Sequence, residues 1–310
     1  MLDAWRIAAG HLGLGTIPAD TGVGADAIVW QLRAPRIVLA AIAGAGLAVI
    51  GVVVQGVTRN ALADPYLLGL SAGASLGAVT VVAFGLGAIG SIQLTAGAFC
   101  GAAGAFAVVL AVAQLGGRIA PVRTILAGVA IGELCAAATA FLTIRETNAD
   151  ATRSLLVWLL GGFSGAAWSD LLLPAAIVLL ALIVAIGDSR TLDALALGDD
   201  TASSLGIAVD AARRRLLVVS ALATAVLVAT CGAIGFVGLV LPHIARFAVG
   251  GRHRRVLPVA ALAGALLMVW VDAVARTAFA PEELPVGVVT ALIGAPFFVV
   301  LLRRQGRRAA

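Results

Sequence analysis

The 310-residue sequence contains no lysine and few charged residues of either sign. Charged residues make up 12% of the chain and hydrophobic residues 61%, whereas soluble domains contain about 25% and about 45–50% respectively. A protein core could not hide this much apolar surface from water, so we expect a lipid bilayer to surround most of the chain. The composition excludes a soluble globular protein.

The missing lysine also excludes one source of energy. A nucleotide-binding loop of the GxxxxGK[ST] type needs its lysine on the phosphates, so this chain cannot hydrolyse ATP by that route. The net charge of +5 comes from 21 arginines, which are scattered between apolar runs and form no continuous basic face. This distribution argues against nucleic acid as a partner.

Cysteine and histidine are scarce as well. The three cysteines, Cys100, Cys135 and Cys231, stand in apolar segments without ligand-like spacing to one another or to a histidine. We interpret them as small packing residues. We therefore predict that the chain binds no metal ion or cofactor and is not an enzyme.

Apolar runs of membrane-crossing length dominate the sequence. One stretch, 216–249, is too long for a single crossing and contains several glycines and a proline, so we divide it near Gly232. The run 155–166 is too short and is predicted as a partial or surface helix. The remaining pattern predicts an all-α bundle of nine transmembrane helices, at 37–57, 66–86, 92–115, 124–144, 171–187, two within 216–249, 256–279 and 284–302.

Three of the predicted spans carry small residues at four-residue steps. Such faces let helix backbones approach closely inside a membrane. The pattern predicts tight helix packing, and it is formed by Gly69, Gly73 and Gly77, by Gly97 and Gly101, and by Gly128 and Gly132.

The arginines predict the orientation. With nine alternating crossings, one set of loops carries fifteen of the 21 arginines, and the positive-inside rule makes that set cytoplasmic. The C-terminus, including a tail at 305–310, is then cytoplasmic, and an N-terminal segment at 1–36 is external. Charged residues and Pro18 interrupt that segment, so we predict no cleavable signal peptide. The six external arginines are Arg6, Arg33, Arg36, Arg145, Arg153 and Arg276.

Six strings occur in order along nearly the whole chain: RAPR (33–36), QGVTRNALADPYLLGLSAGASLGA (55–78), ILAGVAIG (125–132), LLVWLLGGFSGAAWSDL (155–171), GAIGFVGLVLPHIARF (232–247) and ELPVGVVTALIGAPFFVVLLRR (283–304). In sequence and spacing they resemble the FecCD family, the membrane permeases of ABC importers for cobalamin, haem and ferric siderophores. The resemblance implies ten spans per subunit and a homodimer. This sequence supplies nine spans, and the span without a counterpart is the first, because residues 1–15 resemble the external segment that follows the first span in the family. Either the chain starts beyond that span or this subunit lacks that helix.

The resemblance implies a role for three external arginines. In such permeases, external arginines receive carboxylates from a soluble substrate-binding protein, and the matching positions here are Arg33, Arg36 and Arg276. The guanidinium fork suits bidentate pairing with a carboxylate. An anchor at the lipid headgroups is the alternative. Asp272 stands four residues before Arg276, a spacing that favours pairing along the helix.

The longest polar stretch, 188–215, is predicted to form short helices in a cytoplasmic loop within the transmembrane domain at 37–304. By resemblance this loop seats the ATP-binding subunit, which would hold ATP and Mg. An ordinary solvated loop is the alternative, and Arg213 to Arg215 are interpreted as a topology anchor. The carried-over coupling residues are Gly198, Asp199, Asp200, Ser204, Leu205 and Gly206.

By resemblance, the translocation pathway follows the dimer axis, lined by 124–144, 155–166 and the last span with Thr290. The cytoplasmic gate is assigned to Asn60, Leu62, Pro121 and Val122, although the last two stand where small polar residues are expected.

Glu133 also departs from the family pattern, because it lies near the bilayer centre. Burying a charge there costs about 2.5–3.5 kcal/mol on insertion scales, so we expect Glu133 to face the bundle interior. It either lines the pathway and contacts the cargo or is protonated and hydrogen-bonded to a neighbouring helix.

We predict a permease in the cytoplasmic (inner) membrane that moves a metal chelate inward, with ferric siderophore as the first expectation and haem or cobalamin next. Its partners are a second copy, two ATP-binding subunits and an extracytoplasmic binding protein. The alternative is a secondary transporter driven by an ion gradient. That class predicts several intramembrane acids, and Glu133 alone qualifies.

Overall fold

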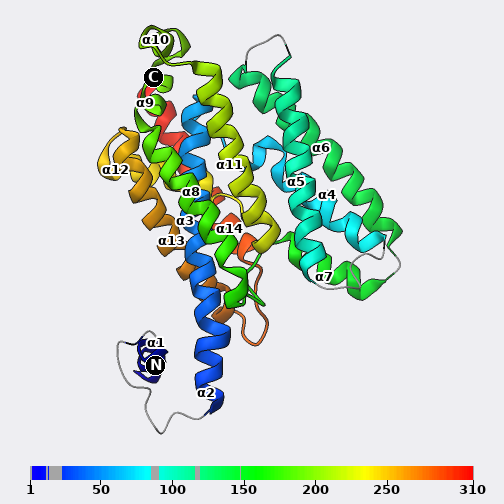
Figure 1. The fold of residues 1–310 in the computed structure, drawn as a ribbon. Coiled ribbons are helices and arrows are strands. Elements are labelled where there is room, and N and C mark those ends of the chain that lie inside the picture. Colours follow the sequence, from blue (N-terminus) through cyan, green and yellow to red (C-terminus); the bar gives the residue numbers. More distant parts are fainter. Residues whose placement is uncertain are drawn as a thin grey trace.

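The computed structural model describes residues 2–11, 13, 23–84, 91–115, 119–146 and 148–309, and within these ranges every regular element is a helix. The predicted all-α class is confirmed. Figure 1 shows most long helices lying along one bundle axis, with the N-terminus and α2 at one end and the C-terminus, α9 and α10 at the other. Helix α1 and the end of α14 thus lie at opposite ends of the bundle.

The elements follow one another as α1 (Leu2–His11), α2 (Val23–Ala27), η1 (Ile28–Arg33), α3 (Ala34–Thr58), η2 (Pro65–Leu68), α4 (Leu70–Ala83), α5 (Ser91–Ala113), α6 (Pro121–Arg145), α7 (Ala149–Leu159), η4 (Trp168–Asp170), α8 (Leu172–Gly187), α9 (Ser189–Leu197), α10 (Asp199–Ser204), α11 (Val209–Cys231), α12 (Val237–Val249), α13 (His253–Thr277) and α14 (Val286–Ala309).

Six helices of the described chain are long and apolar enough to cross a membrane: Gly24–Thr58, Gln93–Ala113, Pro121–Arg145, Trp168–Gly187, Val209–Cys231 and His253–Thr277. Three shorter apolar helices, Leu70–Ala83, Val237–Val249 and Val286–Val300, occupy the other predicted positions. At 1.5 Å per residue a 13-residue helix is about 20 Å long, less than the roughly 30 Å hydrocarbon core. The predicted positions hold apolar helices, but the count of nine spans is not confirmed.

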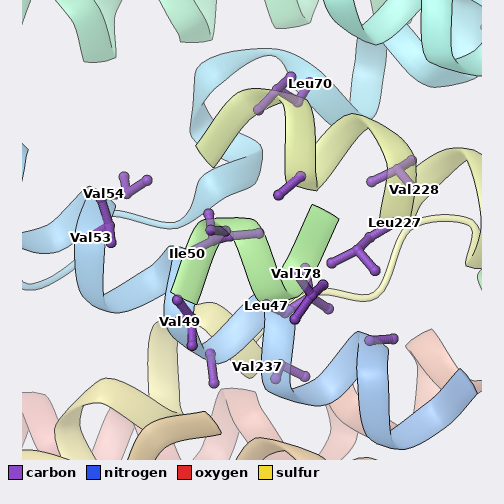
Figure 2. Close-up of a cluster of buried hydrophobic side chains, with 14 of the residues drawn as sticks. Leu47, Val49, Ile50, Val53, Val54, Leu70, Val178, Leu227, Val228 and Val237 are labelled. Carbon is purple, nitrogen blue, oxygen red and sulfur yellow. The ribbon is translucent and has the colours of Figure 1, made fainter. Parts of the chain in front are cut away.

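Helix α3 is the centre of the bundle. It packs against α8, α11, α12 and α13, and from Leu39 onward most of its residues are buried. Figure 2 shows Leu47, Val49 and Ile50 of α3 in one cluster with side chains of α8, α11 and α12. Helix α3 is therefore surrounded by four other helices along most of its length.

The faces of small residues bring helix backbones into close contact. A Cβ atom added to Gly77 of α4 would lie 2.0 Å from the carbonyl oxygen of Gly97 in α5, and one on Gly128 of α6 would lie 2.0 Å from that of Leu67. The predicted close packing is confirmed for the glycines of α4 and α5 and for Gly128, whereas a Cβ on Gly132 would meet its nearest neighbour only at 3.9 Å. A further crossing, Gly44 of α3 on Gly264 of α13, has the same character, with 2.1 Å from the added Cβ to the Gly264 oxygen.

The predicted break near Gly232 is confirmed. Helix α11 ends at Cys231, and α12 begins at Val237 after Phe236, which has a left-handed backbone (φ 69°). Within this break the Ile234 N–H donates to the Tyr66 hydroxyl at 3.0 Å. Irregular backbone at membrane depth needs such partners.

The helix predicted at 155–166 is displaced in the structure. Helix α7 spans Ala149–Leu159, and the chain is irregular from Leu160 to Ala167. Gly161 has a φ of 72°, and its carbonyl accepts from the Val286 N–H at 3.0 Å. The Leu160 carbonyl likewise accepts from the Gly287 N–H at 3.1 Å. Bonds from Leu160 and Gly161 to the start of α14 therefore replace a further helical turn where the apolar pattern predicted the helix to continue.

Candidate functional site

Polar side chains gather at the two ends of α3. Arg36 stands in its first turn, and Arg59 follows its last residue, Thr58. Arg36 therefore lies at the end of the bundle that carries α2, and Arg59 at the end that carries α9 and α10 (Figure 1). By the predicted orientation, the first end is external and the second cytoplasmic.

At the predicted external end, Arg36, Asp272, Arg276 and Glu283 form a cluster, called here the external arginine cluster. Arg36 Nε donates to Asp272 Oδ1 at 2.9 Å, and its Nη1 donates to Glu283 Oε2 at 2.9 Å. Arg276 Nε lies 3.1 Å from Asp272 Oδ2, so the predicted pairing of Asp272 and Arg276 is confirmed. The Asp272 side chain is 1% exposed and is shared by both arginines.

The three arginines assigned to docking differ in their availability. Arg36 is 12% exposed and is bound by two carboxylates of its own chain, whereas Glu283 is 46% exposed. Arg276 is partly exposed, and Arg33 is exposed at the end of η1 with no ion pair to a described residue. Sequence reasoning missed Glu283, although it stands in the last of the six strings.

At the opposite end, residues 188–215 contain the predicted short helices, α9 and α10. Gly198 separates them with a φ of 119°, a conformation that favours glycine. Leu197 and Leu205 are 71% and 65% exposed. Of the predicted coupling residues, Leu205, Asp200, Ser204 and Gly206 are exposed; Leu197 was not among those predicted. The loop thus presents apolar and acidic groups outward.

Asp199, the first residue of α10, points instead toward the bundle. Arg213 Nη2 donates to Asp199 Oδ1 at 2.8 Å, and Arg59 Nη2 lies 3.7 Å from the same oxygen. Arg213 also donates to the carbonyl oxygen of Ile119 at 2.7 Å. Arg213 is 2% exposed, so this member of the arginine triplet is a buried structural group.

The four residues assigned to the gate lie in two separate segments. Asn60 and Leu62 form the turn after α3, in which the Leu62 N–H donates to Asn60 Oδ1 at 2.9 Å. Pro121 and Val122 begin α6, and Val122 is exposed. The first segment follows Arg59, which lies 3.7 Å from Asp199, and the second follows Ile119, whose carbonyl accepts from the Arg213 that binds Asp199.

Glu133 does not face the interior of its own chain's bundle, which corrects the expectation from the sequence. Glu133 is exposed because α6 lies at the edge of the bundle (Figure 1), where α4 and α5 pack against its opposite side. Exposed residues recur along this side at helical spacing. We call it the α6 outer face; it comprises Val122, Leu126, Val129, Glu133, Leu134, Phe141 and Ile144.

Thr290 of α14 lies in an enclosed place. It is 4% exposed, and its hydroxyl donates to the Gly287 carbonyl at 3.0 Å. It borders an apolar cavity of about 110 Å³ between α12, α13 and α14, with Phe236, Val240 and Phe297 among the lining residues. Thr290 is therefore held by its own helix at the edge of an apolar cavity.

A further buried polar contact was not predicted. Gln55 of α3 donates through Nε2 to the Leu239 carbonyl oxygen at 3.2 Å and accepts from Arg246 of α12.

Across the residues that the structure describes, no three His, Cys, Asp or Glu side chains lie together in a way that could hold a metal ion.

Comparison with known proteins gives consistent results. The chain is 41% identical over 282 residues to the hemin transport system permease protein HmuU of Yersinia pestis, covering 89% of this chain and 84% of that protein. It is 42% identical over 285 residues to the cobalamin import system permease protein BtuC of Halobacterium salinarum, covering 92% and 76%. These relatives are transport permeases and not enzymes.

Among solved structures, the fold matches an inward-facing metal-chelate type ABC transporter with a TM-score of 0.84 and 32% identity, covering 98% of this chain and 97% of that one. The pattern of the FecCD transport family matches residues 9–304. The chain therefore belongs to the FecCD transport family.

Proposed function

We propose that the chain is the membrane-spanning permease subunit of an ABC importer that carries a metal chelate into the cytoplasm. Family membership, the haem and cobalamin permeases among its relatives, and the likeness to a metal-chelate transporter all support this proposal. Separate subunits bind ATP and Mg and hydrolyse the nucleotide. We propose a ferric siderophore as the first candidate for the carried molecule, with haem and cobalamin as the next candidates.

The observation that carries the proposal is the polarity of the bundle. One end holds the external arginine cluster, and the other holds two short helices that present Leu197 and Leu205 outward. An importer needs one surface that binds the substrate-binding protein and another, at the opposite end of the helix bundle, that binds the ATP-binding subunit.

The external end suits a binding protein that offers carboxylates. Arg33 is exposed and Arg276 partly so, and an arginine fork pairs bidentately with a carboxylate. Arg36 is already held by Asp272 and Glu283, so a docking carboxylate would have to replace Glu283. We assign first contact to Arg33 and Arg276, and to Arg36 the positioning of Arg276 through the Asp272 that both arginines contact.

The α6 outer face suits a second copy of this chain. It is apolar apart from Glu133, and a carboxyl group near the bilayer centre is costly if it faces lipid. In a dimer with α6 at its axis, Glu133 would instead line a passage. The last span, with Thr290, would border the same passage after a rearrangement of α12 to α14.

The test is purification of the tagged chain from cytoplasmic membranes, followed by reconstitution in vesicles. We expect two copies of the chain to co-purify with two ATP-binding subunits. Uptake should require ATP on the motor side and the binding protein on the other, and uptake of ferric siderophore, haem and cobalamin should be compared. Uptake that ignores ATP but collapses with the proton gradient would support a secondary transporter instead.

A further inference from the structure

Asp199 lies where three elements meet. It is the first residue of α10, and its carboxylate binds Arg213 of α11 through two guanidinium nitrogens, at 2.8 and 3.3 Å. The same carboxylate lies 3.7 Å from Arg59, the residue that ends α3 with a left-handed backbone (φ 51°). One side chain of the coupling loop therefore contacts the ends of two long helices.

The backbone of Ile119 is held on both sides by the same region. Its carbonyl oxygen accepts from Arg213 Nη1 at 2.7 Å, and its N–H donates to Asp210 Oδ1 at 3.1 Å. Ile119 is buried and stands two residues before Pro121, where α6 begins. The start of α6 is thus fixed to α11, and through Arg213 to Asp199.

The two connections lead to the two segments of the predicted gate. Arg59 directly precedes Asn60, and Ile119 precedes Pro121 and Val122 by two and three residues. A peptide chain cannot stretch over so short a distance, so a displacement of Arg59 or Ile119 also moves the neighbouring gate residues. Asp199 is therefore linked to both segments.

The pair of Asp199 and Arg213 is built to stay together during movement. Arg213 is 2% exposed, and separating a buried guanidinium from its carboxylate leaves an uncompensated charge. The bidentate geometry also fixes the relative angle of the two groups. A shift of α10 is accordingly passed to Arg213 and not absorbed by a loose contact.

We propose that Asp199 is a positioning residue that transmits movement of the α9–α10 loop to both cytoplasmic gate segments, through Arg213 to Ile119 and through Arg59 to Asn60. The inference rests on the proposed function, in which this loop seats the ATP-binding subunit. It adds that Asp199 acts on the gate segments of its own chain and does not belong to the surface that binds the ATP-binding subunit.

The chain offers a matched control in Asp188. Asp188 begins the same loop and also pairs with an arginine, since Arg215 Nε donates to its Oδ2 at 3.0 Å. Arg215 is exposed, and no described contact of this pair reaches a gate segment. Asp188→Asn removes the same charge from the same loop without touching the proposed route.

The experiment measures three quantities for Asp199→Asn and Asp188→Asn in the complete reconstituted transporter: the co-purifying ATP-binding subunit, the ATPase rate, and the amount of cargo imported per ATP hydrolysed. For Asp199→Asn we expect normal assembly and ATPase activity within about twofold, but roughly tenfold less cargo per ATP, because a charged hydrogen-bond pair is weakened. Asp188→Asn should behave as the wild type in all three.

Arg59→Gln provides a second variant in case Asp199→Asn does not fold. Arg59 is exposed and makes the longer contact, so the variant should fold and lose about two- to threefold in cargo per ATP. Unchanged coupling in both variants would overturn the inference, as would loss of the ATP-binding subunit from folded Asp199→Asn. If the wild type itself shows no ATP-dependent uptake, the proposed function has failed, and not this inference alone.

Discussion

Considering single residues first, the two most buried charged side chains of the described chain, Arg213 and Asp272, each lie beside an opposite charge. Asp272 is held by Arg36 and Arg276, and Asp199 by Arg59 and Arg213. Arg213 and Asp272 are almost completely buried, where an unpaired charge is costly. The paired charges therefore mark positions that cannot be changed independently.

Asp272→Asn should destabilise the protein strongly, because it leaves two arginines near one another without their shared carboxylate. We expect a loss of about 3–5 kcal/mol, the usual cost of breaking a buried ion pair, measured as a lower melting temperature in detergent. Asp188→Asn breaks a more exposed pair and should cost at most about 1 kcal/mol. Equal melting temperatures for the two variants would contradict this account of the external arginine cluster.

Glu133→Gln should lower cargo uptake while leaving the melting temperature unchanged, because Glu133 makes no described contact within its chain and lies on the α6 outer face. If its carboxylate contacts the cargo, its loss costs about 1.5–3 kcal/mol, or at least about tenfold in uptake rate. Glu146→Gln, at the end of the same helix, is the control and should transport normally. Full uptake in Glu133→Gln would exclude a role in the pathway.

At the scale of helices, the bundle depends on close backbone crossings and on interrupted helices. Gly73 and Gly77 of α4 lie against Gly101 and Gly97 of α5, and small residues supply most of the association between helices where lipid removes the hydrophobic driving force. The interruption between α11 and α12 places polar backbone inside the bundle, where the Tyr66 hydroxyl accepts from the Ile234 N–H.

Gly77→Ala should therefore destabilise the α4–α5 pair, since the new methyl group would lie 2.0 Å from the Gly97 oxygen. Overpacking of this kind costs about 1–3 kcal/mol. Gly104→Ala on α5 is the matched control, because nothing lies within 4 Å of its added Cβ and alanine favours the helix by up to about 1 kcal/mol. Melting in detergent should separate the two variants, and a loss in both would indicate a general intolerance of alanine.

At the scale of the whole molecule, one chain leaves an apolar side unpartnered. The α6 outer face runs along the edge of the bundle, and several residues of α8 are also exposed. Exposed apolar residues are expected where lipid surrounds a protein, so exposure alone does not distinguish lipid from a second copy. Glu133 distinguishes the two faces, because the exposed residues of α8 are apolar.

Cysteine cross-linking tests which face meets the second copy. In a variant without Cys100, Cys135 and Cys231, Val129→Cys on α6 should yield a disulfide-linked dimer under mild oxidation in membranes. Leu179→Cys, at an exposed position on α8, should remain monomeric. Cross-linking through α8 and not through α6 would place the dimer axis elsewhere and remove Glu133 from the proposed pathway.

The amino-acid sequence was enough to predict a membrane as the surrounding solvent, the positions of most apolar helices, most of the glycine crossings and the break near Gly232. These features depend on composition and on patterns a few residues long, which are complete within the sequence. The end of α7 at Leu159 was not predictable in this way, because it depends on hydrogen bonds from the distant start of α14 to the carbonyls of Leu160 and Gly161.

Which charges meet, and which helix face stays uncovered, depends on how the helices pack together. Arg36 is bound by Glu283, and Asp199 by Arg59 and Arg213, because helix packing brings together segments that are far apart in the chain. Helical periodicity places Glu133 on one side of α6 with Val129 and Leu126, but it cannot say whether another helix covers that side. Whether another helix covers that side of α6 depends on the arrangement of all the helices in the bundle.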